Sequence, residues 1–267
     1  MRIKFRGRIY KVLLRRKIIP VGFEEIIPDF YGTPQNRSGI AGDRLQGRVV
    51  LITGAQKGIG FAIASRLLRE GAKVIITDRD EHLLLEAVRQ LDTPNVAYMV
   101  WDITDGQESN HFRQAVQIFG KVDVLVNNAA IKKEVDPYTD IETATRDYIH
   151  AIHDTNVLAT VRMCECFVDM FSSGAILNVL SNTAVRAAVG IYWMSKWALY
   201  GYTKGLSERL KGSGVTVNGI CPGPSRTDMM HDYIENVYFK TPLNKRLGLP
   251  EEMAELALIQ ILSGLDG

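Results

Sequence analysis

The chain has 267 residues, of which 46% are hydrophobic and 23% are charged, and its formal net charge is +2. This length and composition suit one globular domain with a sizeable core, and the small net charge does not favour a nucleic-acid partner. The cysteines Cys164, Cys166 and Cys221 are too few and too unevenly spaced for a disulfide framework or a zinc site. We therefore expect no metal, a cytoplasmic location and, since no apolar run approaches about 20 residues, no membrane span.

Residues 1 to about 46 differ in composition from the rest of the chain. Basic residues interleaved with apolar ones precede the first acidic residue, Glu24. Such a segment could lie on an anionic membrane surface or serve as a targeting peptide, but its first serine is Ser38 and no small-residue cleavage site follows an apolar core. We favour an arm that is partly disordered or packs on the body or a neighbouring subunit, followed by an irregular linker. The sequence thus predicts a basic arm and linker, 1–46, and one domain, 47–267.

From Arg48 onward, strand and helix patterns alternate, which is typical of a parallel sheet covered on both faces. The apolar run 49–52 ends in the glycine-rich turn Thr53-Gly54-Ala55-Gln56-Lys57-Gly58-Ile59-Gly60, and a helix follows until Gly71. Glycines in such a turn let backbone N–H groups approach a pyrophosphate at the positive end of the helix. The spacing is not the G-x-G-x-x-G pattern, but the place between a strand and a helix supports a nucleotide site.

The second predicted strand, 73–77, ends in Asp78, where a carboxylate can accept hydrogen bonds from an adenosine 2′-hydroxyl. That carboxylate repels a 2′-phosphate and favours NAD. Lys57 and Arg79 favour NADP, because both are placed to pair with a phosphate. We weigh the carboxylate more heavily, since two cations only partly offset a like charge at the phosphate. A guanidinium stacked on the adenine would suit either cofactor.

The later strands also end in polar or small residues. The strand 96–101 is followed by Asp102 and Ile103, which suit an adenine edge, and the strand 122–126 by Asn127-Asn128-Ala129-Ala130, against which a flat cofactor can lie. A long helix, 142–171, carries Asn156 together with His150 and His153, which we interpret as surface or interface residues because no ligand cluster lies nearby. Three segments follow, namely the strand 174–180 with Ser181 at its end, the helix 192–211, and the strand 215–220 running into Cys221-Pro222-Gly223-Pro224-Ser225-Arg226-Thr227. Residues 229–245 suit a lid or a surface helix pair, and a last helix spans 250–262.

Tyr192 and Lys196 lie four residues apart and therefore share one face of their helix, with about 5–6 Å between Cβ atoms. A phenol needs its pKa lowered by about 3 to act near neutrality, and an ammonium at ~4 Å supplies roughly that much before its own desolvation is subtracted. We therefore expect Lys196 to lower the pKa of Tyr192. Alone, the pair also fits a half-buried tyrosine beside a solvated lysine, and Ser181 alone fits a serine that caps local backbone.

In this order, the motifs resemble the compact branch of the short-chain dehydrogenase/reductase family over residues 46 to about 262. The resemblance rests on Thr53-Gly54, Gly58, Gly60, Asp78, Asp102, Asn127-Asn128-Ala129, Asn156, Ser181, Tyr192, Lys196, Asn218, Pro222-Gly223 and Thr227. It implies a Rossmann-type doubly wound parallel sheet with helices on both faces. It also implies hydride transfer between NAD(P)(H) and a secondary alcohol or ketone, and a homodimer or tetramer formed through the helices of Asn156 and Tyr192.

The resemblance assigns roles to the matching residues. Tyr192 would be the general acid or base, Ser181 would bind the substrate oxygen, and Lys196 would stabilise the phenolate and hold ribose hydroxyls. Asn156 would link the lysine to solvent through a water. The cofactor would contact Tyr192 and Lys196 together with Gly54, Lys57, Gly58, Ile59, Gly60, Asp78, Arg79, Asp102, Ile103, Asn128, Ala129, Pro222, Gly223 and Thr227.

The chain departs from the family pattern in three places. Ala130 replaces the usual glycine after the asparagine motif, and the interval from Ser181 to Tyr192 is two residues shorter than usual, which requires a tight loop over 182–191. We also expect the sheet to lack the seventh strand that in the family usually follows the last helix. These departures and the arm leave open a catalytically weak or inactive scaffold or regulator that docks through the arm. The complete Ser-Tyr-Lys set favours the enzyme, and steroid, sugar, acyl thioester and small polyol substrates all stay open.

Overall fold

The computed structural model of the protein describes residues 42–132, 144–185, 190–230 and 247–265. These residues belong to one compact unit, made of Ala41–Tyr238 and Leu247–Gly267. Residues 1–41, which form most of the predicted arm with its possible contact to a membrane surface, lie outside the described residues. Residues 186–189 of the predicted tight loop and residues 231–245 of the predicted lid also lie outside them.

The core of this unit is a six-stranded sheet in which every pair of neighbours is parallel and the strand order is β3-β2-β1-β4-β5-β6. The strands are β1 (Val49–Thr53), β2 (Lys73–Asp78), β3 (Val96–Val100), β4 (Val124–Asn127), β5 (Gly174–Val179) and β6 (Val215–Ile220). The order reverses between β1 and β4, so a crevice is expected at the carboxyl ends of these two strands. The predicted Rossmann-type fold is confirmed, and β3 and β6 are the edges of the described sheet.

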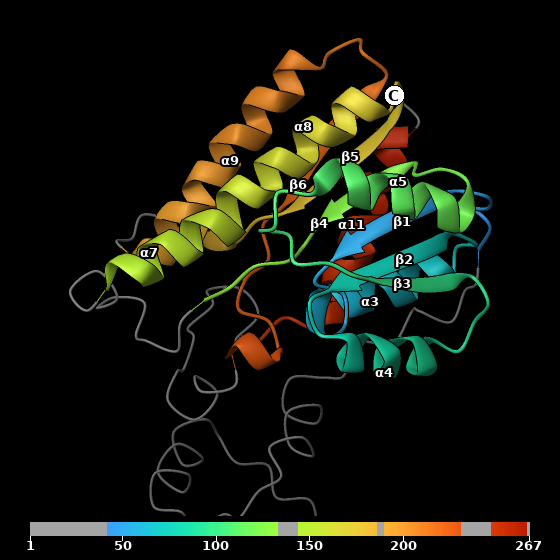
Figure 1. Cartoon of the computed structure of the whole chain (residues 1–267), viewed down its shortest axis with the longest axis horizontal. Helices are drawn as coiled ribbons and strands as arrows, with labels where there is room; N and C mark the ends of the chain where they lie inside the picture. The colour runs from blue at the N-terminus through green and yellow to red at the C-terminus, as the bar shows by residue number, and fades with distance from the viewer. Residues whose placement is uncertain (1–41, 133–143, 186–189, 231–246, 266–267) are drawn as a thin grey trace, which may run out of the picture. The chain divides into compact units, whose positions relative to one another are not determined.

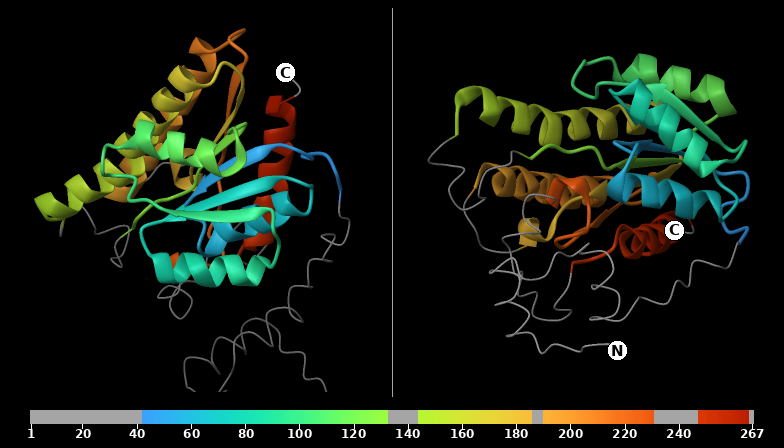
Figure 2. Two further views of the ribbon diagram at one scale, coloured as in Figure 1. Left: turned by 45° about the vertical axis from the view of Figure 1, so that its right-hand side comes forward. Right: turned by 90° about the horizontal axis from the view of Figure 1, so that it is seen from below.

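Helices cover both faces of the sheet (Figure 1). One face packs against α3 (Gly58–Leu68), α4 (Glu81–Leu91) and α11 (Pro250–Leu265), and the other against α5 (Glu108–Phe119), α8 (Thr160–Met170) and α9 (Ile191–Arg209). The views of Figure 2 show α11 alongside α3. Among the described residues, no helix combines the length and the apolar character that a membrane crossing requires.

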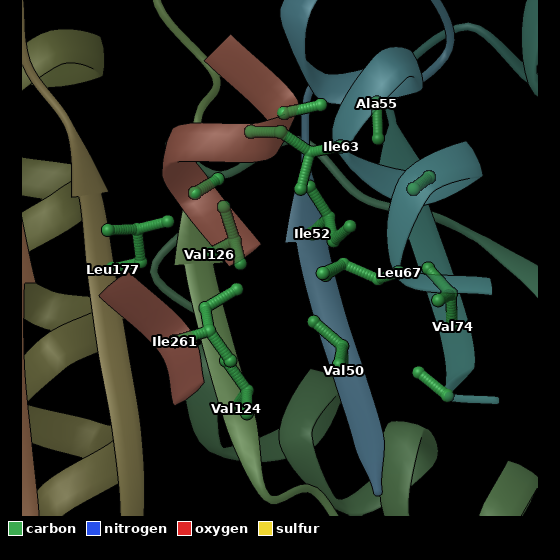
Figure 3. Packing of buried hydrophobic residues seen from close by; sticks show 14 of the residues in the cluster. Val50, Ile52, Ala55, Ile63, Leu67, Val74, Val124, Val126, Leu177 and Ile261 are labelled. Carbon is green, nitrogen blue, oxygen red and sulfur yellow. The ribbon is translucent and has the colours of Figure 1, made fainter. Parts of the chain in front are cut away.

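Strand β1 illustrates why the sheet reads as continuous apolar runs in the sequence. Val50 and Ile52 point to the core shared with α3 and α11, whereas Val49 and Leu51 point to the core on the opposite face. Figure 3 shows the first of these cores, with Ile52 near Ile63 and Leu67 of α3. Because successive side chains of a strand alternate between faces, a strand covered on both sides needs apolar residues at every position.

The described chain begins with residues that already pack on the domain. Leu45 is fully buried, and the N–H groups of Gly42 and Leu45 donate to the carbonyl oxygens of Arg69 and Glu70. The Arg44 guanidinium also forms an ion pair with the Glu70 carboxylate. The last residues of the expected linker, 42–46, are therefore part of the folded unit, because burial of Leu45 and the ion pair hold them there.

The long helix predicted at 142–171 is interrupted in the structure. Its described part consists of α7 (Arg146–His153), a π-helix η2 (Asp154–Ala159) and α8. A π-helical turn closes its hydrogen bonds one residue later than an α-helical turn, which changes the direction in which side chains point. The sequence pattern alone did not show this interruption. Two short 3₁₀ turns, η3 (Asn182–Val185) and η4 (Asp228–Met230), follow β5 and β6.

Candidate functional site

The glycine-rich turn lies between β1 and α3, and its backbone needs glycine at two positions. Gly54 and Gly58 have φ values of 61° and 62°, in the left-handed region that residues with a Cβ rarely adopt. A Cβ on Gly60 would lie 2.5 Å from Asn128 Nδ2, so only glycine fits there. The first turn of α3 has no side-chain cap and no acidic residue, which leaves its N–H groups suited to an anion.

The end of β4 is held against this turn by hydrogen bonds. Asn128 Nδ2 donates to the carbonyl oxygens of Thr53 and Gly54 at 2.9 and 2.7 Å. Thr53 Oγ1 accepts from the N–H groups of Asn128 and Ala129, both at 3.1 Å. A Cβ on Gly54 would lie 2.7 Å from Ala129 Cα. The predicted residues of β1 and β4 therefore meet where the strand order reverses.

The predicted adenosine-binding residues lie at the ends of β2 and β3. Asp78 is half-buried, and its Oδ1 accepts from the Asp80 N–H at 3.1 Å, whereas the neighbouring Arg79 is exposed. Asp102 Oδ1 accepts from the Thr104 N–H at 2.9 Å and from its hydroxyl at 2.7 Å. These hydrogen bonds orient both carboxylates while each side chain stays accessible.

The segment after β6 also lies against the glycine turn. Thr227 Cγ2 is 3.4 Å from the place where a Cβ on Gly58 would lie. The next residue, Asp228, forms an ion pair with Lys57, with 2.9 Å between Oδ2 and Nζ. The Lys57 side chain is therefore turned toward η4 in this structure. Sequence reasoning identified Lys57 and Thr227 but missed Asp228, because nothing in the spacing shows that the two loops meet.

Pro222 and Gly223 contact the loop that begins after Ser181. The Pro222 carbonyl oxygen accepts from the Asn182 N–H at 2.8 Å, and a Cβ on Gly223 would lie 3.7 Å from Asn182 Nδ2. This backbone contact ties the end of β6 to the end of β5.

Ser181 and Tyr192 come together although they belong to different elements. Ser181 follows β5 and is buried, and Tyr192 lies in the first turn of α9. Burial raises the pKa of Tyr192 to about 12, and a hydrogen bond with the Ser181 side chain acts in the opposite direction. The phenol is therefore protonated at neutral pH in this structure.

Lys196 lies one helical turn after Tyr192 and is 2% exposed. Its Nζ donates to the Val179 carbonyl oxygen at 3.1 Å and lies 5.9 Å from the centroid of the Tyr192 ring. Burial lowers the pKa of Lys196 to about 8, and a charge interaction with Cys221 acts in the opposite direction. The expectation that Lys196 lowers the pKa of Tyr192 is wrong for this structure, because desolvation of the phenol dominates and the ammonium is hydrogen-bonded to β5.

Asn156 lies in the π-helix η2 and is fully buried. Its Oδ1 accepts from the Ile131 N–H at 2.8 Å, and its Nδ2 donates to the Ile131 carbonyl oxygen at 2.9 Å and to Ser195 Oγ at 3.3 Å. Ser195 Oγ donates in turn to the Tyr192 carbonyl oxygen at 2.6 Å. Asn156 therefore connects the segment after β4 with the first turn of α9, and its expected link to Lys196 through a water stays a prediction.

A buried chain of polar side chains, which we call the amide network, was missed by sequence reasoning. Asn127 Nδ2 donates to Asn178 Oδ1 at 2.8 Å, and Asn178 Nδ2 donates to Thr203 Oγ1 at 2.9 Å. Thr203 Oγ1 donates to the Leu199 carbonyl oxygen at 2.7 Å. The amide network therefore joins β4, β5 and α9, of which β4 precedes Asn128, β5 precedes Ser181 and α9 carries the Tyr192–Lys196 pair.

His150 and His153 lie on α7 and are both exposed. In the part of the chain that the structure describes, no group of three or more histidine, cysteine, aspartate or glutamate side chains is arranged to hold a metal ion.

The sequence profile described as short chain dehydrogenase matches residues 48–237. The glucose and ribitol dehydrogenase of Daucus carota is 30% identical over 230 residues, which cover 79% of this chain and 78% of that protein. A short chain dehydrogenase from Burkholderia cenocepacia, solved in complex with NADP, has a TM-score of 0.72 and 29% identity, and the match covers 82% of this chain and 91% of that one.

A variant of actinorhodin polyketide ketoreductase, solved with NADPH, has a TM-score of 0.73 and 25% identity over 84% of this chain and 93% of that one. The profile match spans most of the described unit and includes the glycine turn, Ser181, Tyr192 and Lys196. From the sheet order, the glycine turn and these matches together, we conclude that the chain belongs to the short-chain dehydrogenase/reductase family of oxidoreductases.

Proposed function

We propose that the protein transfers a hydride between a nicotinamide dinucleotide and a secondary alcohol or ketone. The observation that carries this proposal is the convergence of Ser181, Tyr192 and Lys196 at the carboxyl end of β5. The Ser181 side chain is hydrogen-bonded to Tyr192, and Lys196 Nζ donates to the last residue of that strand. A hydroxyl donor, an acidic phenol and a cation in one place are the groups that a carbonyl reduction requires.

The residues around the glycine turn fit a dinucleotide. Gly54, Gly58 and Gly60 keep side chains away from the uncapped start of α3, and Gln56 Oε1 in the same turn is buried without a hydrogen-bond partner among the described residues. In our proposal, the N–H groups of α3 hold the pyrophosphate and Asp78 holds the adenosine ribose. The bound cofactor would supply or accept the hydride.

Ser181, Tyr192 and Lys196 would carry out the remaining steps of the proposed reaction. Ser181 and Tyr192 would donate hydrogen bonds to a ketone oxygen, which orients the carbonyl and stabilises the negative charge that develops there. Because burial raises the pKa of Tyr192 to about 12, the phenol keeps a proton to donate throughout the neutral range. Lys196 would hold ribose hydroxyls and stabilise the phenolate that remains after proton transfer.

Asp78 supports NAD as the preferred cofactor. Its half-buried carboxylate at the end of β2 would accept from a 2′-hydroxyl and repel a 2′-phosphate. NADP stays an alternative cofactor, because similar structures contain NADP and NADPH and because Lys57 and Arg79 could pair with a 2′-phosphate.

The test combines cofactor binding with turnover. We expect purified protein to bind NADH in a fluorescence or calorimetric titration and to oxidise it with at least one member of a panel of ketones and aldoses. The proposal would be overturned if the protein bound neither NADH nor NADPH. Binding without turnover across the panel and across the matching alcohols would favour the inactive scaffold instead.

We also propose that subunits associate through the helices that carry Asn156 and Tyr192. Three large apolar side chains are exposed there, namely Leu158, Met194 and Trp197, at 43%, 59% and 46%. Exposed apolar patches of this kind are typical of protein–protein interfaces. Light scattering coupled to size-exclusion chromatography should give a dimer or tetramer, and a monomer at micromolar concentration would contradict this assembly.

A further inference from the structure

We propose that Asp228 is a cofactor-specificity residue, which disfavours a 2′-phosphate by pairing with Lys57. The inference rests on the proposed function and concerns the same site. Lys57 is the cation of the glycine turn, and a cation at this place would otherwise be the residue most suited to a phosphorylated ribose.

The contact that carries the inference is an ion pair between two loops. Lys57 Nζ lies 2.9 Å from Asp228 Oδ2, and the two side chains are 54% and 71% exposed. Because both groups are accessible to solvent, the ammonium can exchange one anionic partner for another. A ligand phosphate and the Asp228 carboxylate would therefore compete for Lys57.

Backbone contacts keep the carboxylate close to the turn. The Arg226 N–H donates to the Gly248 carbonyl oxygen, and the Gly248 N–H donates to the Pro224 carbonyl oxygen, both at 2.8 Å. These hydrogen bonds join the segment before η4 to the residues that precede α11, and the Thr227 methyl group lies against Gly58. Asp228 is therefore held beside Lys57 by the fold, and its charge stays near the turn even when the ion pair opens.

Asp228 and Asp78 would both disfavour a 2′-phosphate, but by different means. Asp78, at the end of β2, would accept from an unmodified ribose and repel a phosphate directly. Asp228, on the other side of the glycine turn, would reduce the attraction that Lys57 exerts on a phosphate. An exposed ion pair is weak, so neutralising Asp228 should change the affinity for a 2′-phosphate by about two- to fivefold.

The experiment compares two adenosine ligands that differ only in a 2′-phosphate. Calorimetric titrations with adenosine 5′-monophosphate and with adenosine 2′,5′-bisphosphate would be made on the wild type, D228N, K57M and the K57M/D228N double variant. We expect D228N to tighten binding of the bisphosphate about two- to fivefold and to leave binding of the monophosphate unchanged. In the K57M background, the same Asp228 change should have no effect on either ligand. Asp169→Asn on α8 is the matched control, because it removes one exposed carboxylate on the other face of the sheet.

The outcomes separate the inference from the function on which it rests. If wild-type protein binds adenosine 5′-monophosphate and NADH but D228N leaves the ratio of the affinities for the bisphosphate and the monophosphate unchanged, the inference is overturned and the proposed function stands. If the double variant still bound the 2′-phosphorylated ligand more tightly than K57M does, the inference would also be overturned, because Asp228 would then act without Lys57. If wild-type protein binds none of adenosine 5′-monophosphate, NADH and NADPH, both proposals fall together.

Discussion

The Lys196 ammonium donates to the Val179 carbonyl oxygen at 3.1 Å, so a residue of α9 is hydrogen-bonded to the strand that leads to Ser181. This contact sets the distance between the two elements that hold the proposed reacting groups. It also removes a charged group from water, since the Lys196 side chain is almost fully buried. A position in which charge is retained at a cost in stability is typical of a functional site.

Replacing Lys196 with methionine should therefore stabilise the protein while it removes function. Burial lowers the pKa of Lys196 from 10.5 to about 8, which corresponds to a cost of up to about 3 kcal/mol at pH 7. The cost is present in full below pH 8 and disappears as the pH rises toward 10.5, because the unfolded chain then also loses the proton. Urea unfolding at pH 7 and pH 10 should show a gain for K196M that is smaller at the higher pH. Lys204→Met, at an exposed position of the same helix, should show neither effect.

Removing the phenolic hydroxyl of Tyr192 should abolish turnover without weakening cofactor binding. Loss of a general acid typically costs about 10²- to 10⁴-fold in rate. We expect Y192F to show a decrease of this size in kcat with a selected ketone and an NADH affinity within about twofold of the wild type. Tyr200→Phe on the same helix is the matched control. Turnover of Y192F at the wild-type rate would rule out the proposed role.

Replacing Asp78 with alanine should shift cofactor preference toward NADPH. The change removes both the acceptor for a 2′-hydroxyl and the charge that repels a 2′-phosphate, so we expect the ratio of the NADPH and NADH affinities to rise by about tenfold or more. Titrations of both cofactors measure it directly. An unchanged ratio would mean that Lys57 and Arg79 decide the specificity.

The ion pairs of Glu70 should make the stability of the domain sensitive to acid. Glu70 is 1% exposed and pairs with Arg44 and Arg66, and the Arg44 hydrogen bond is the largest effect that lowers the pKa of Glu70 from 4.5 to about 2. The stabilisation is complete above pH 4.5 and is lost as the pH falls toward 2, since the unfolded carboxylate takes up its proton first. Glu70→Gln should cost about 3–5 kcal/mol at pH 7 and less at pH 3, as measured by chemical unfolding. An equal loss at both values would contradict the role of the charge.

Thr203 offers a test of the amide network. Thr203→Val would leave Asn178 Nδ2 buried without its acceptor at 2.9 Å, which should cost about 1–3 kcal/mol in the free energy of unfolding. Because Asn178 lies on the strand that ends before Ser181, we also expect kcat to fall more than KM rises. Thr203→Ser keeps the hydroxyl and should restore both quantities. A loss of stability with unchanged kcat would limit the network to a structural role.

The order of strands and helices followed from patterns that act over a few residues. Alternating apolar strands and helices predicted the parallel sheet, and the predicted strand at 215–220 matches β6. The glycine turn was recognisable because it stands between an apolar strand and a helix and because left-handed backbone favours glycine, as at Gly54 and Gly58. These constraints depend on residues that are close in the chain and on the alternation of side chains, so they can be predicted from the sequence alone.

The sequence by itself determined the family, the fold and the candidate residues of the proposed site. The tertiary structure alone decided which side chains these residues meet. Lys57 meets Asp228, Asn127 meets Asn178 and then Thr203, and Asn156 lies in a π-helical turn. Burial at the end of β5 raises the pKa of Tyr192, where the spacing to Lys196 predicted the opposite. Hydrogen-bond partners and desolvation depend on segments far apart in the chain, and no local pattern of residues records which of them meet.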